Sequence, residues 1–225
     1  MKKIISIVLP VFNEEAILKS LHQKLSEVIS KRSERFEMIF VNDGSVDKSL
    51  AVLLDIRKRD NRVCILDFSR NFGHQNSLNA GLRETKGDAV ILMDADLEDS
   101  PEDILKFLEK WDVGYEVVYA IRKKRNVPWL KSVLFKLFHK INNTLSTIDI
   151  EEAGIFSLMD RTVVNAILNI NESNLYLPGL RNWVGFKQIG IAVNRGVRYD
   201  ASPRVSILRL YKLAFDSFTG FSGNL

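Results

Sequence analysis

Short apolar runs recur along the first half of the chain and alternate with segments of helical spacing. Between the first two runs, Leu18, Leu21 and Leu25 repeat every three to four residues, as on the buried side of an amphipathic helix. The alternation predicts a parallel sheet covered by helices, and runs that are apolar throughout predict burial of both sheet faces. The predicted strands are residues 4–9, 36–41, 63–68, 89–93 and 116–120.

Polar residues directly follow four of these predicted strands. In open parallel sheets, ligands bind beyond the carboxyl ends of the strands, so these segments are the candidate site. We expect all four to meet at one edge of the sheet. They are residues 10–15 (PVFNEE), 42–45 (NDGS), 69–74 (SRNFGH) and 94–96 (DAD).

The Asp-x-Asp pattern places Asp94 and Asp96 on one side of the chain at the end of a buried strand. Carboxylate oxygens suit a hard divalent ion, and Glu98 is a third candidate ligand. Mg²⁺ or Mn²⁺ held by one or two carboxylates completes its octahedron with phosphate oxygens, which indicates a nucleotide or diphosphate substrate. The alternative is that the acids start the next helix. Ser100 is the better cap for that helix, because Asp94 and Asp96 come too early.

Two further positions each allow two interpretations. Gly44 permits an unusual backbone angle, so residues 42–45 are typical of a tight turn; alternatively, Asp43 accepts hydrogen bonds from a nucleobase such as uracil. For His74, a loop residue or helix cap is the simpler interpretation, because no His or Cys at zinc spacing accompanies it. Cys64 lies within an apolar run and is predicted to be a buried thiol.

Length and missing motifs exclude several classes of protein. A chain of 225 residues suffices for one α/β domain with a sizeable core, and no apolar run approaches the roughly 20 residues of a membrane span. One cysteine rules out a disulfide framework. The sequence lacks G-x-G-x-x-G after the first strand, the P-loop motif and G-x-S-x-G, so dinucleotide dehydrogenases, P-loop enzymes and common hydrolases are not supported.

The charge is unevenly distributed along the chain. The net charge is +4, but residues 117–148 carry seven Lys or Arg and no acidic residue. This run indicates an anionic partner such as a phosphate, nucleic acid or lipid headgroups, or else a solvated basic face.

Residues 134–145 and 202–221 predict amphipathic helices. The second of these packs on the domain or lies in a membrane interface.

Together the motifs resemble the inverting family 2 glycosyltransferases with the GT-A fold. The similarity runs from residue 4 to about residue 222. More narrowly, it looks like the branch of dolichol-phosphate mannose synthases and bacterial polyprenyl-phosphate glycosyltransferases. The motifs are SIVLPVFNEE (6–15), VNDGSVD (41–47), SRNFGHQNSLNAGL (69–82), GDAVILMDADLEDSPE (87–102) and GIFSLMDR (154–161).

The resemblance implies a single α/β domain over residues 1–225, with a Rossmann-like, mostly parallel central sheet flanked by helices and with C-terminal amphipathic helices. Residues 1–120 would form the half that binds the nucleotide-sugar. Residues 121–225 would form the half that faces the acceptor and the membrane. In this family the nucleoside is held at the positions of Pro10, Glu14, Asp43 and Asp94.

The resemblance also assigns the metal and the catalytic residues. Asp96 matches the main protein ligand of Mg²⁺ or Mn²⁺, and Glu98 stands where the family usually has Gln, which keeps an oxygen ligand and adds a negative charge. Arg122 and Arg125 match basic residues that face the acceptor phosphate, which Arg grips bidentately. With Asp94 and Asp96 they complete the predicted catalytic set. Because a phosphate oxygen already carries charge, no strong general base is required.

Two departures from the family pattern affect this prediction. The family motif Gly-Asp-Phe-Arg-Leu-Met is Gly-Ile-Phe-Ser-Leu-Met here, so Ile155 and Ser157 replace a carboxylate and a guanidinium at the active site. Glu151 or Glu152 are candidates to compensate. Members of this branch usually continue into transmembrane helices. We therefore expect either a longer parent chain or reliance on the amphipathic helix before Leu225.

The predicted function is metal-dependent, inverting transfer of a sugar from a nucleotide diphosphate donor, a UDP-sugar first, to polyprenyl phosphate at the cytoplasmic face of the membrane. The predicted partners are the donor, the lipid acceptor and the membrane surface, not nucleic acid, and a homo-oligomer is left open. One alternative is a soluble family 2 transferase acting on a glycan hydroxyl. Another is a catalytically weak nucleotide-sugar-binding protein, which the residues at 155 and 157 suggest.

Overall fold

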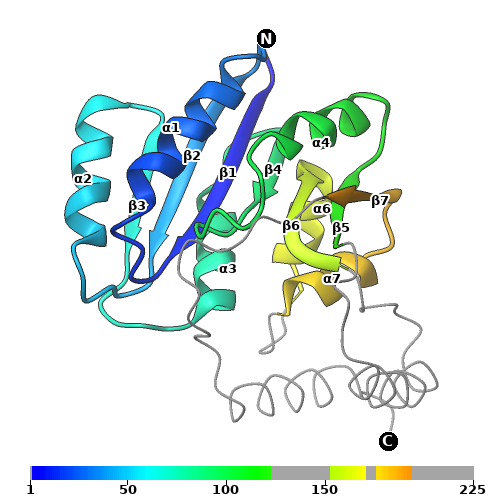
Figure 1. Cartoon of the computed structure of the whole chain (residues 1–225). Coiled ribbons are helices and arrows are strands. Elements are labelled where there is room, and N and C mark those ends of the chain that lie inside the picture. Colours follow the sequence, from blue (N-terminus) through cyan, green and yellow to red (C-terminus); the bar gives the residue numbers. More distant parts are fainter. Residues whose placement is uncertain (1, 123–152, 171–175, 194–225) are drawn as a thin grey trace, which may run out of the picture.

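The structure is a computed structural model that describes residues 2–122, 153–170 and 176–193 (Figure 1). Both predicted amphipathic helices, together with Arg125, Glu151 and Glu152, lie outside these ranges. The backbone of Arg122 is described as the end of a strand, but its side chain is not. Within the described ranges, no helix is both long and apolar enough to cross a bilayer.

A seven-stranded sheet runs through the molecule in the order β3-β2-β1-β4-β6-β5-β7. The first four strands in this order are parallel to one another, while β6 is antiparallel to both of its neighbours. The predicted α/β class with a mostly parallel central sheet is confirmed, and all five predicted strands are present. The strands are β1 Ile4–Val11, β2 Arg35–Asn42, β3 Val63–Asp67, β4 Ala89–Leu92, β5 Val117–Arg122, β6 Ala153–Asp160 and β7 Gln188–Val193.

Helices cover the two faces of this sheet in two sets of three (Figure 1). The first set, α1, α2 and α4, packs on one face, and the second set, α3, α6 and α7, packs on the other. The helices are α1 Leu18–Ile29, α2 Ser49–Arg59, α3 His74–Glu84, α4 Asp103–Asp112, α6 Arg161–Leu168 and α7 Leu177–Trp183.

Strand β1 shows why both faces are buried. Its side chains alternate between faces, so Ile7 and Leu9 join the core under α1, α2 and α4, while Val8 joins the core under α3. All three are fully buried, and each such side chain contributes about 1.5–3 kcal/mol by leaving water. The prediction that continuous apolar runs indicate burial on both faces is therefore confirmed for β1.

Helix α3 packs unusually close to the sheet. A Cβ atom added at Gly81 would lie 2.3 Å from Cγ1 of Val8, so only glycine allows this approach. The close packing fixes the position of the whole helix, including His74 at its start, relative to the carboxyl end of β1.

Two local predictions were wrong. Cys64 is exposed rather than buried, because β3 is the edge strand of the sheet. Ser100 does not cap α4 through its side chain, since its hydroxyl donates to the Glu102 carboxylate instead. The carbonyl of Ser100 accepts the Asp103 backbone N–H at 3.1 Å, so a turn precedes the helix.

Candidate active site

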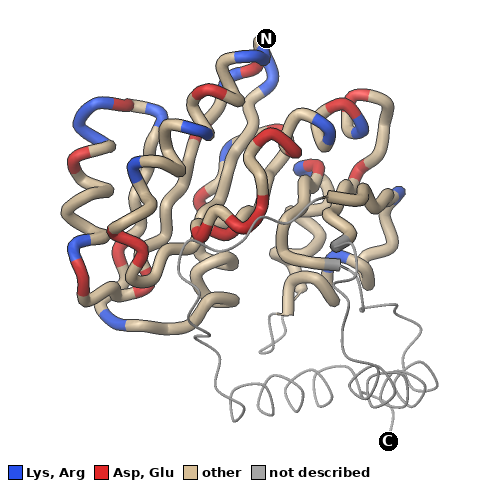
Figure 2. Tube along the Cα trace, viewed as in Figure 1, with Lys and Arg blue, Asp and Glu red and all other residues tan. Residues whose placement is uncertain are grey.

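The carboxyl ends of β1, β2 and β4 lie at the same edge of the sheet, because these strands are parallel and adjacent. A cavity of about 360 Å³ opens at this edge. It is lined by residues from all four segments that were predicted to converge there, and by Ser77 of α3. Figure 2 shows acidic segments in the chain that follows β1 and in the chain that follows β4. The lining residues are Pro10, Val11, Phe12, Glu14, Asp43, His74, Ser77, Asp94, Ala95 and Asp96.

Hydrogen bonds join the loop after β1 to the loop after β2. Asn13 adopts a positive φ of 56°, a conformation that Asn tolerates better than most residues. Its side-chain oxygen accepts the Val46 N–H at 2.9 Å, and its own N–H donates to the Ser45 hydroxyl at 3.0 Å. The Glu14 N–H donates to the Ser49 hydroxyl at 2.9 Å. The backbone of Glu14, a predicted nucleoside-binding residue, is thus held at the cavity by its neighbours.

Asp43 ties the end of β2 to the loop before α3. Its carboxylate is 3% exposed and accepts backbone N–H groups from Phe72 at 2.7 Å and from Gly73 at 3.0 Å. Such charge-assisted bonds are about twice as strong as neutral ones. The neighbouring Gly44 has φ +62°, and a Cβ there would lie 2.3 Å from the carbonyl carbon of Arg70. Gly44 therefore adopts the unusual backbone angle that was predicted, in a bend directly after β2, and Asp43 also lines the cavity.

His74 contacts the first aspartate of the Asp-x-Asp pair. Its Nε2 atom lies 2.7 Å from Oδ1 of Asp94. Burial opposes the charged imidazole, but the hydrogen bond to Asp94 and the nearby carboxylates outweigh it and raise the pKa of His74 above its usual value. The interpretation of His74 as a simple loop residue missed this contact. Its place in a polar segment directly after a predicted strand was the available signal.

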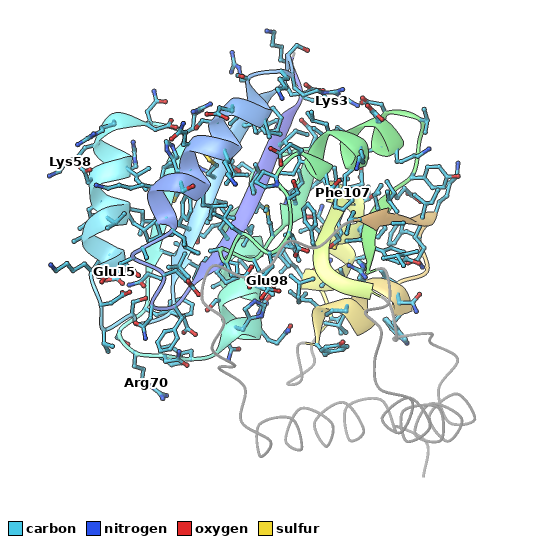
Figure 3. The ribbon with its side chains drawn as sticks, viewed as in Figure 1. Lys3, Glu15, Lys58, Arg70, Glu98 and Phe107 are labelled. Carbon is cyan, nitrogen blue, oxygen red and sulfur yellow. The ribbon has the colours of Figure 1, made fainter. Side chains whose placement is uncertain are left out.

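The second aspartate shapes the turn that follows β4. Oδ1 of Asp96 accepts the Glu98 N–H at 3.0 Å, across Leu97, whose φ is +57°. Asp96 lines the cavity, whereas Glu98 is not among its lining residues. In Figure 3, Glu98 lies near the middle of the view, while Glu15 and Arg70 lie toward the β3 end of the sheet.

The donor set fits a metal ion that is shared with a substrate. Among residues 2–122, 153–170 and 176–193, no three His, Cys, Asp or Glu side chains form a group that could hold a metal by themselves. Asp96 presents a carboxylate to a cavity large enough for a diphosphate, and Mg²⁺ commonly binds through one or two carboxylates plus phosphate oxygens and water. The assignment of Asp96 and Glu98 as ligands stays a prediction.

The predicted acceptor residues are only partly described. Arg122 ends β5, opposite Val193 of β7, but the position of its guanidinium is not part of the description. Arg125 lies outside the described residues. Their roles as phosphate-binding residues therefore stay predictions.

Strand β6 brings the two departures from the family motif to the same edge. Ser157 pairs with Leu92 in the antiparallel register, and continuing that register by two residues places Ile155 level with Asp94. The buried Ser157 hydroxyl donates to the carbonyl of Ile155 at 2.8 Å. The position at which the family motif predicts a carboxylate is thus beside the candidate site and is occupied by the apolar Ile155 in this protein.

Arg181 of α7 covers this part of β6 and was missed by sequence reasoning. Its guanidinium donates from Nη1 to the Gly154 carbonyl at 3.2 Å, and its Cζ atom lies 4.9 Å from the ring centre of Tyr119. The residue is 3% exposed, and this burial lowers its pKa to about 10. A basic residue inside the mostly apolar segment LPGLRNWVGF was the signal that could have drawn attention to it.

The chain belongs to glycosyl transferase family 2, whose family model matches residues 6–168. It is 42% identical to the glycosyltransferase YkcC of Bacillus subtilis over 96% of this chain and 68% of that protein. It is 39% identical to the glycosyltransferase sll0501 of Synechocystis over 97% of this chain and 69% of that protein. The bactoprenol glucosyl transferase of Shigella phage SfX is 37% identical, over 97% of this chain and 72% of that protein.

Solved structures support the fold. Glucosyl-3-phosphoglycerate synthase from Mycobacterium tuberculosis, in complex with Mg²⁺ and UDP, superposes with a TM-score of 0.63 at 16% identity, covering 97% of this chain and 79% of that one. Mannosyl-3-phosphoglycerate synthase from Rubrobacter xylanophilus gives a TM-score of 0.63 at 14% identity, covering 97% and 72%. The predicted GT-A fold is confirmed.

Proposed function

We propose that this glycosyltransferase moves a sugar from a nucleotide-diphosphate sugar to a polyprenyl phosphate, with a UDP-sugar as the favoured donor. The observation that carries the proposal is the convergence of Asp43, Asp94 and Asp96 on one cavity in a family 2 chain. The choice of acceptor is supported by 37% identity to a bactoprenol glucosyl transferase.

The residues of the cavity divide into two groups in this proposal. Pro10, Glu14 and Asp43 hold the nucleoside, and the buried Asp43 is already oriented by the backbone N–H groups of residues 72 and 73. Asp94, which contacts His74, would bind the donor together with them. Asp96 would hold Mg²⁺ or Mn²⁺, which supplies positive charge to the departing diphosphate when bound.

The proposed transfer is a single displacement. An acceptor phosphate oxygen forms a bond to the anomeric carbon while the bond from that carbon to the diphosphate oxygen breaks, and the nucleoside diphosphate leaves with the electron pair. The nucleophile loses no proton, so a general base is unnecessary and the apolar Ile155 is tolerable at this position. Inversion at the anomeric carbon is taken from the family resemblance.

The membrane-facing part of the proposal depends on charge. A polyprenyl phosphate resides in a bilayer, and residues 117–148 carry a run of basic side chains that suits an anionic lipid surface. We place the protein at the cytoplasmic face, with residues 1–120 as the nucleotide-sugar half and residues 121–225 as the half that receives the lipid.

A second candidate function is favoured by one observation. Ile155 and Ser157 replace a carboxylate and a guanidinium, which suits a catalytically weak protein that binds nucleotide-sugars without transferring them. A soluble transferase acting on a glycan hydroxyl is less well supported. That reaction needs a base, and Ile155 cannot supply one.

A transfer assay separates the three candidates. The protein would be incubated with Mn²⁺, a panel of radiolabelled nucleotide-sugars, and either a short polyprenyl phosphate or a soluble glycan. Label that enters the organic phase only with the lipid phosphate supports the proposal. Label on the glycan supports the soluble transferase, and donor binding without transfer under any condition supports the binding protein.

A further inference from the structure

Arg181 is more deeply buried than Arg161, which also bonds a backbone carbonyl and has a buried nitrogen without a partner, and it differs from the arginines that form ion pairs in the described part of the chain. Arg32 forms ion pairs with Glu34 and Asp112, and Arg62 pairs with Asp60. Arg181 is 3% exposed, yet its hydrogen bond goes to a backbone carbonyl, and its Nε atom is buried with no hydrogen-bond partner. A buried guanidinium without a carboxylate is costly, so such a group is expected to have an anionic partner during function.

The pocket around Arg181 adjoins the candidate active site but is distinct from it. It lies on the α7 side of β4 and β6, and the active-site cavity lies beyond the end of β4. Its wall includes Leu92, which lies two residues before Asp94, and Ile155, which lies two residues before the Ser157 that pairs with Leu92. The lining residues are Leu92, Ile155, Ser157, Met159, Leu177, Pro178 and Arg181.

Helix α7 is also tied directly to the start of α3. The Leu177 N–H donates to the side-chain oxygen of Gln75 at 3.2 Å, and Gln75 follows His74 in the chain. The helix that carries Arg181 is therefore anchored beside a residue that contacts Asp94. A ligand that spans from Asp94 toward β6 would meet the Arg181 side of the site.

The chemistry of the pocket favours a phosphate group. A guanidinium presents parallel N–H donors that match phosphate oxygens, and the Ser157 hydroxyl is a further donor once it leaves the Ile155 carbonyl. Among the described residues, no acidic side chain lines this pocket, whereas four carboxylates line the neighbouring cavity and repel an anion that arrives without a cation. The pocket is the more favourable place for an anion that brings no metal.

We propose that Arg181, with Ser157 beside it, binds a substrate phosphate group, and that this group is the phosphate of the acceptor. This assignment rests on the proposed function, in which an oxygen of the acceptor phosphate is the nucleophile and approaches the donor from the Arg181 side of Asp94. The pocket as it stands has no room for even a water molecule, so the phosphate can reach the guanidinium only when the Ile155 or Leu177 side chain moves aside. The donor diphosphate is the other source of the same chemistry.

Binding measurements on Arg181→Met and Arg181→Lys test the assignment without requiring turnover. Lys187→Met is the matched control, because Lys187 is an exposed cation that lies 4.8 Å from the ring centre of Tyr115. Each variant would be titrated with a short polyprenyl phosphate, with the corresponding prenyl alcohol, and with UDP plus Mn²⁺. Circular dichroism and thermal unfolding would confirm that each variant is folded.

We expect Arg181→Met to weaken binding of the prenyl phosphate by roughly 10- to 100-fold, the usual effect of losing charge-assisted hydrogen bonds. Binding of the alcohol and of UDP should change less than about twofold, as should every titration of Lys187→Met. A loss confined to UDP would still support a phosphate site but would move it to the donor. Unchanged binding of both phosphate ligands overturns the proposal.

A folding defect in Arg181→Met would not leave the question open. Arg181→Lys keeps the positive charge but loses the planar guanidinium that donates two parallel hydrogen bonds. We therefore expect at least about threefold weaker binding of the prenyl phosphate and an unchanged affinity for UDP. Unchanged binding of the prenyl phosphate by this variant overturns the proposal. Failure of the proposed function gives a different result, in which the unmodified protein transfers no label although its phosphate binding depends on Arg181.

Discussion

Charged side chains are stabilised differently in two neighbouring regions. One is the sheet edge formed by β1, β2 and β4, and the other is the pocket beside β6. At the first, the carboxylates have partners within the chain: Asp43 accepts two backbone N–H groups, and Asp94 contacts His74. At the second, the guanidinium of Arg181 is buried with an unsatisfied Nε atom. The proposed nucleotide side is thus pre-organised by the protein, whereas on the proposed acceptor side no carboxylate among the described residues pairs with the buried guanidinium.

In the proposed function, this difference in charge suits the two sides to different substrates. Four carboxylates around one cavity favour a ligand that arrives with a divalent cation, as a nucleoside diphosphate does. A buried cation beside apolar side chains favours an anion without a metal. A reaction between a nucleotide-sugar and a phosphate monoester fits this division, and variants on either side can test it.

The largest expected effect follows from removing the metal ligand proposed for the donor side. Asp96→Ala should weaken Mn²⁺-dependent binding of UDP by about 100-fold or more, because the cation would lose its main protein ligand. Isothermal titration calorimetry with Mn²⁺ and with EDTA measures this directly. Glu98→Gln is the control, with a change of no more than about fivefold expected, since an oxygen ligand is retained. Unchanged UDP affinity in Asp96→Ala would sink the metal assignment.

The next effect concerns the loops that pre-organise the donor side. Gly44→Ala should lower the free energy of unfolding by about 2–4 kcal/mol, because φ is +62° and the new Cβ would collide with the backbone of Arg70. Urea denaturation gives the value. Gly114→Ala is matched to it, with φ +90° and nothing within 4 Å of the added Cβ, and should cost only about 1–2 kcal/mol. Equal losses in the two variants would contradict the close contact.

A moderate effect is expected when the acceptor side is made to resemble the donor side. Ile155→Asp places a carboxylate in the pocket of Arg181, where it would neutralise the guanidinium and repel a phosphate. The KM for polyprenyl phosphate should rise about tenfold, while the KM for the nucleotide-sugar stays within about twofold. Steady-state kinetics with each substrate varied in turn measures both. A rise confined to the nucleotide-sugar KM would place residue 155 on the donor side.

The smallest effect concerns the pH dependence of stability. In the folded protein the pKa of His74 is raised above its unfolded value of about 6.5. The His74–Asp94 contact therefore stabilises the fold fully below pH 6.5, and this stabilisation is lost as the pH rises through the higher folded pKa. The His74 side chain is partly desolvated but still 44% exposed, and solvent therefore screens the contact and limits its contribution to at most about 1 kcal/mol. Melting temperatures of the unmodified protein and of His74→Gln, measured in EDTA between pH 6 and 9, should converge as pH rises. A constant difference between the two melting temperatures across this pH range would contradict an electrostatic role of His74.

Sequence patterns were sufficient for most of the donor side. Continuous apolar runs marked the five strands, and because the carboxyl ends of parallel strands share an edge, Pro10, Asp43 and Asp94 could be expected to meet. The exposed Cys64 was missed because an apolar run does not reveal whether its strand lies at the edge of the sheet.

The acceptor side was less predictable because it depends on contacts between distant segments. Strand β6 inserts between β4 and β5, and nothing in residues 153–160 indicates that neighbour or its antiparallel direction. Arg181 comes from a helix that follows later still, and its burial depends on packing over Tyr119 of β5. A single basic residue in an apolar segment does not show whether it points to solvent or to the interior.

The reversed direction of β6 has an evolutionary consequence. Because this strand runs opposite to its neighbour β4, its beginning lies at the reactive edge, while Asp160 at its far end accepts the N–H of Thr162 and caps α6. The Ser157 hydroxyl bonds within β6 itself, so a change there breaks no hydrogen bond of the loops around the nucleotide. A substitution on the proposed acceptor side can therefore leave the hydrogen bonds of the proposed donor side intact.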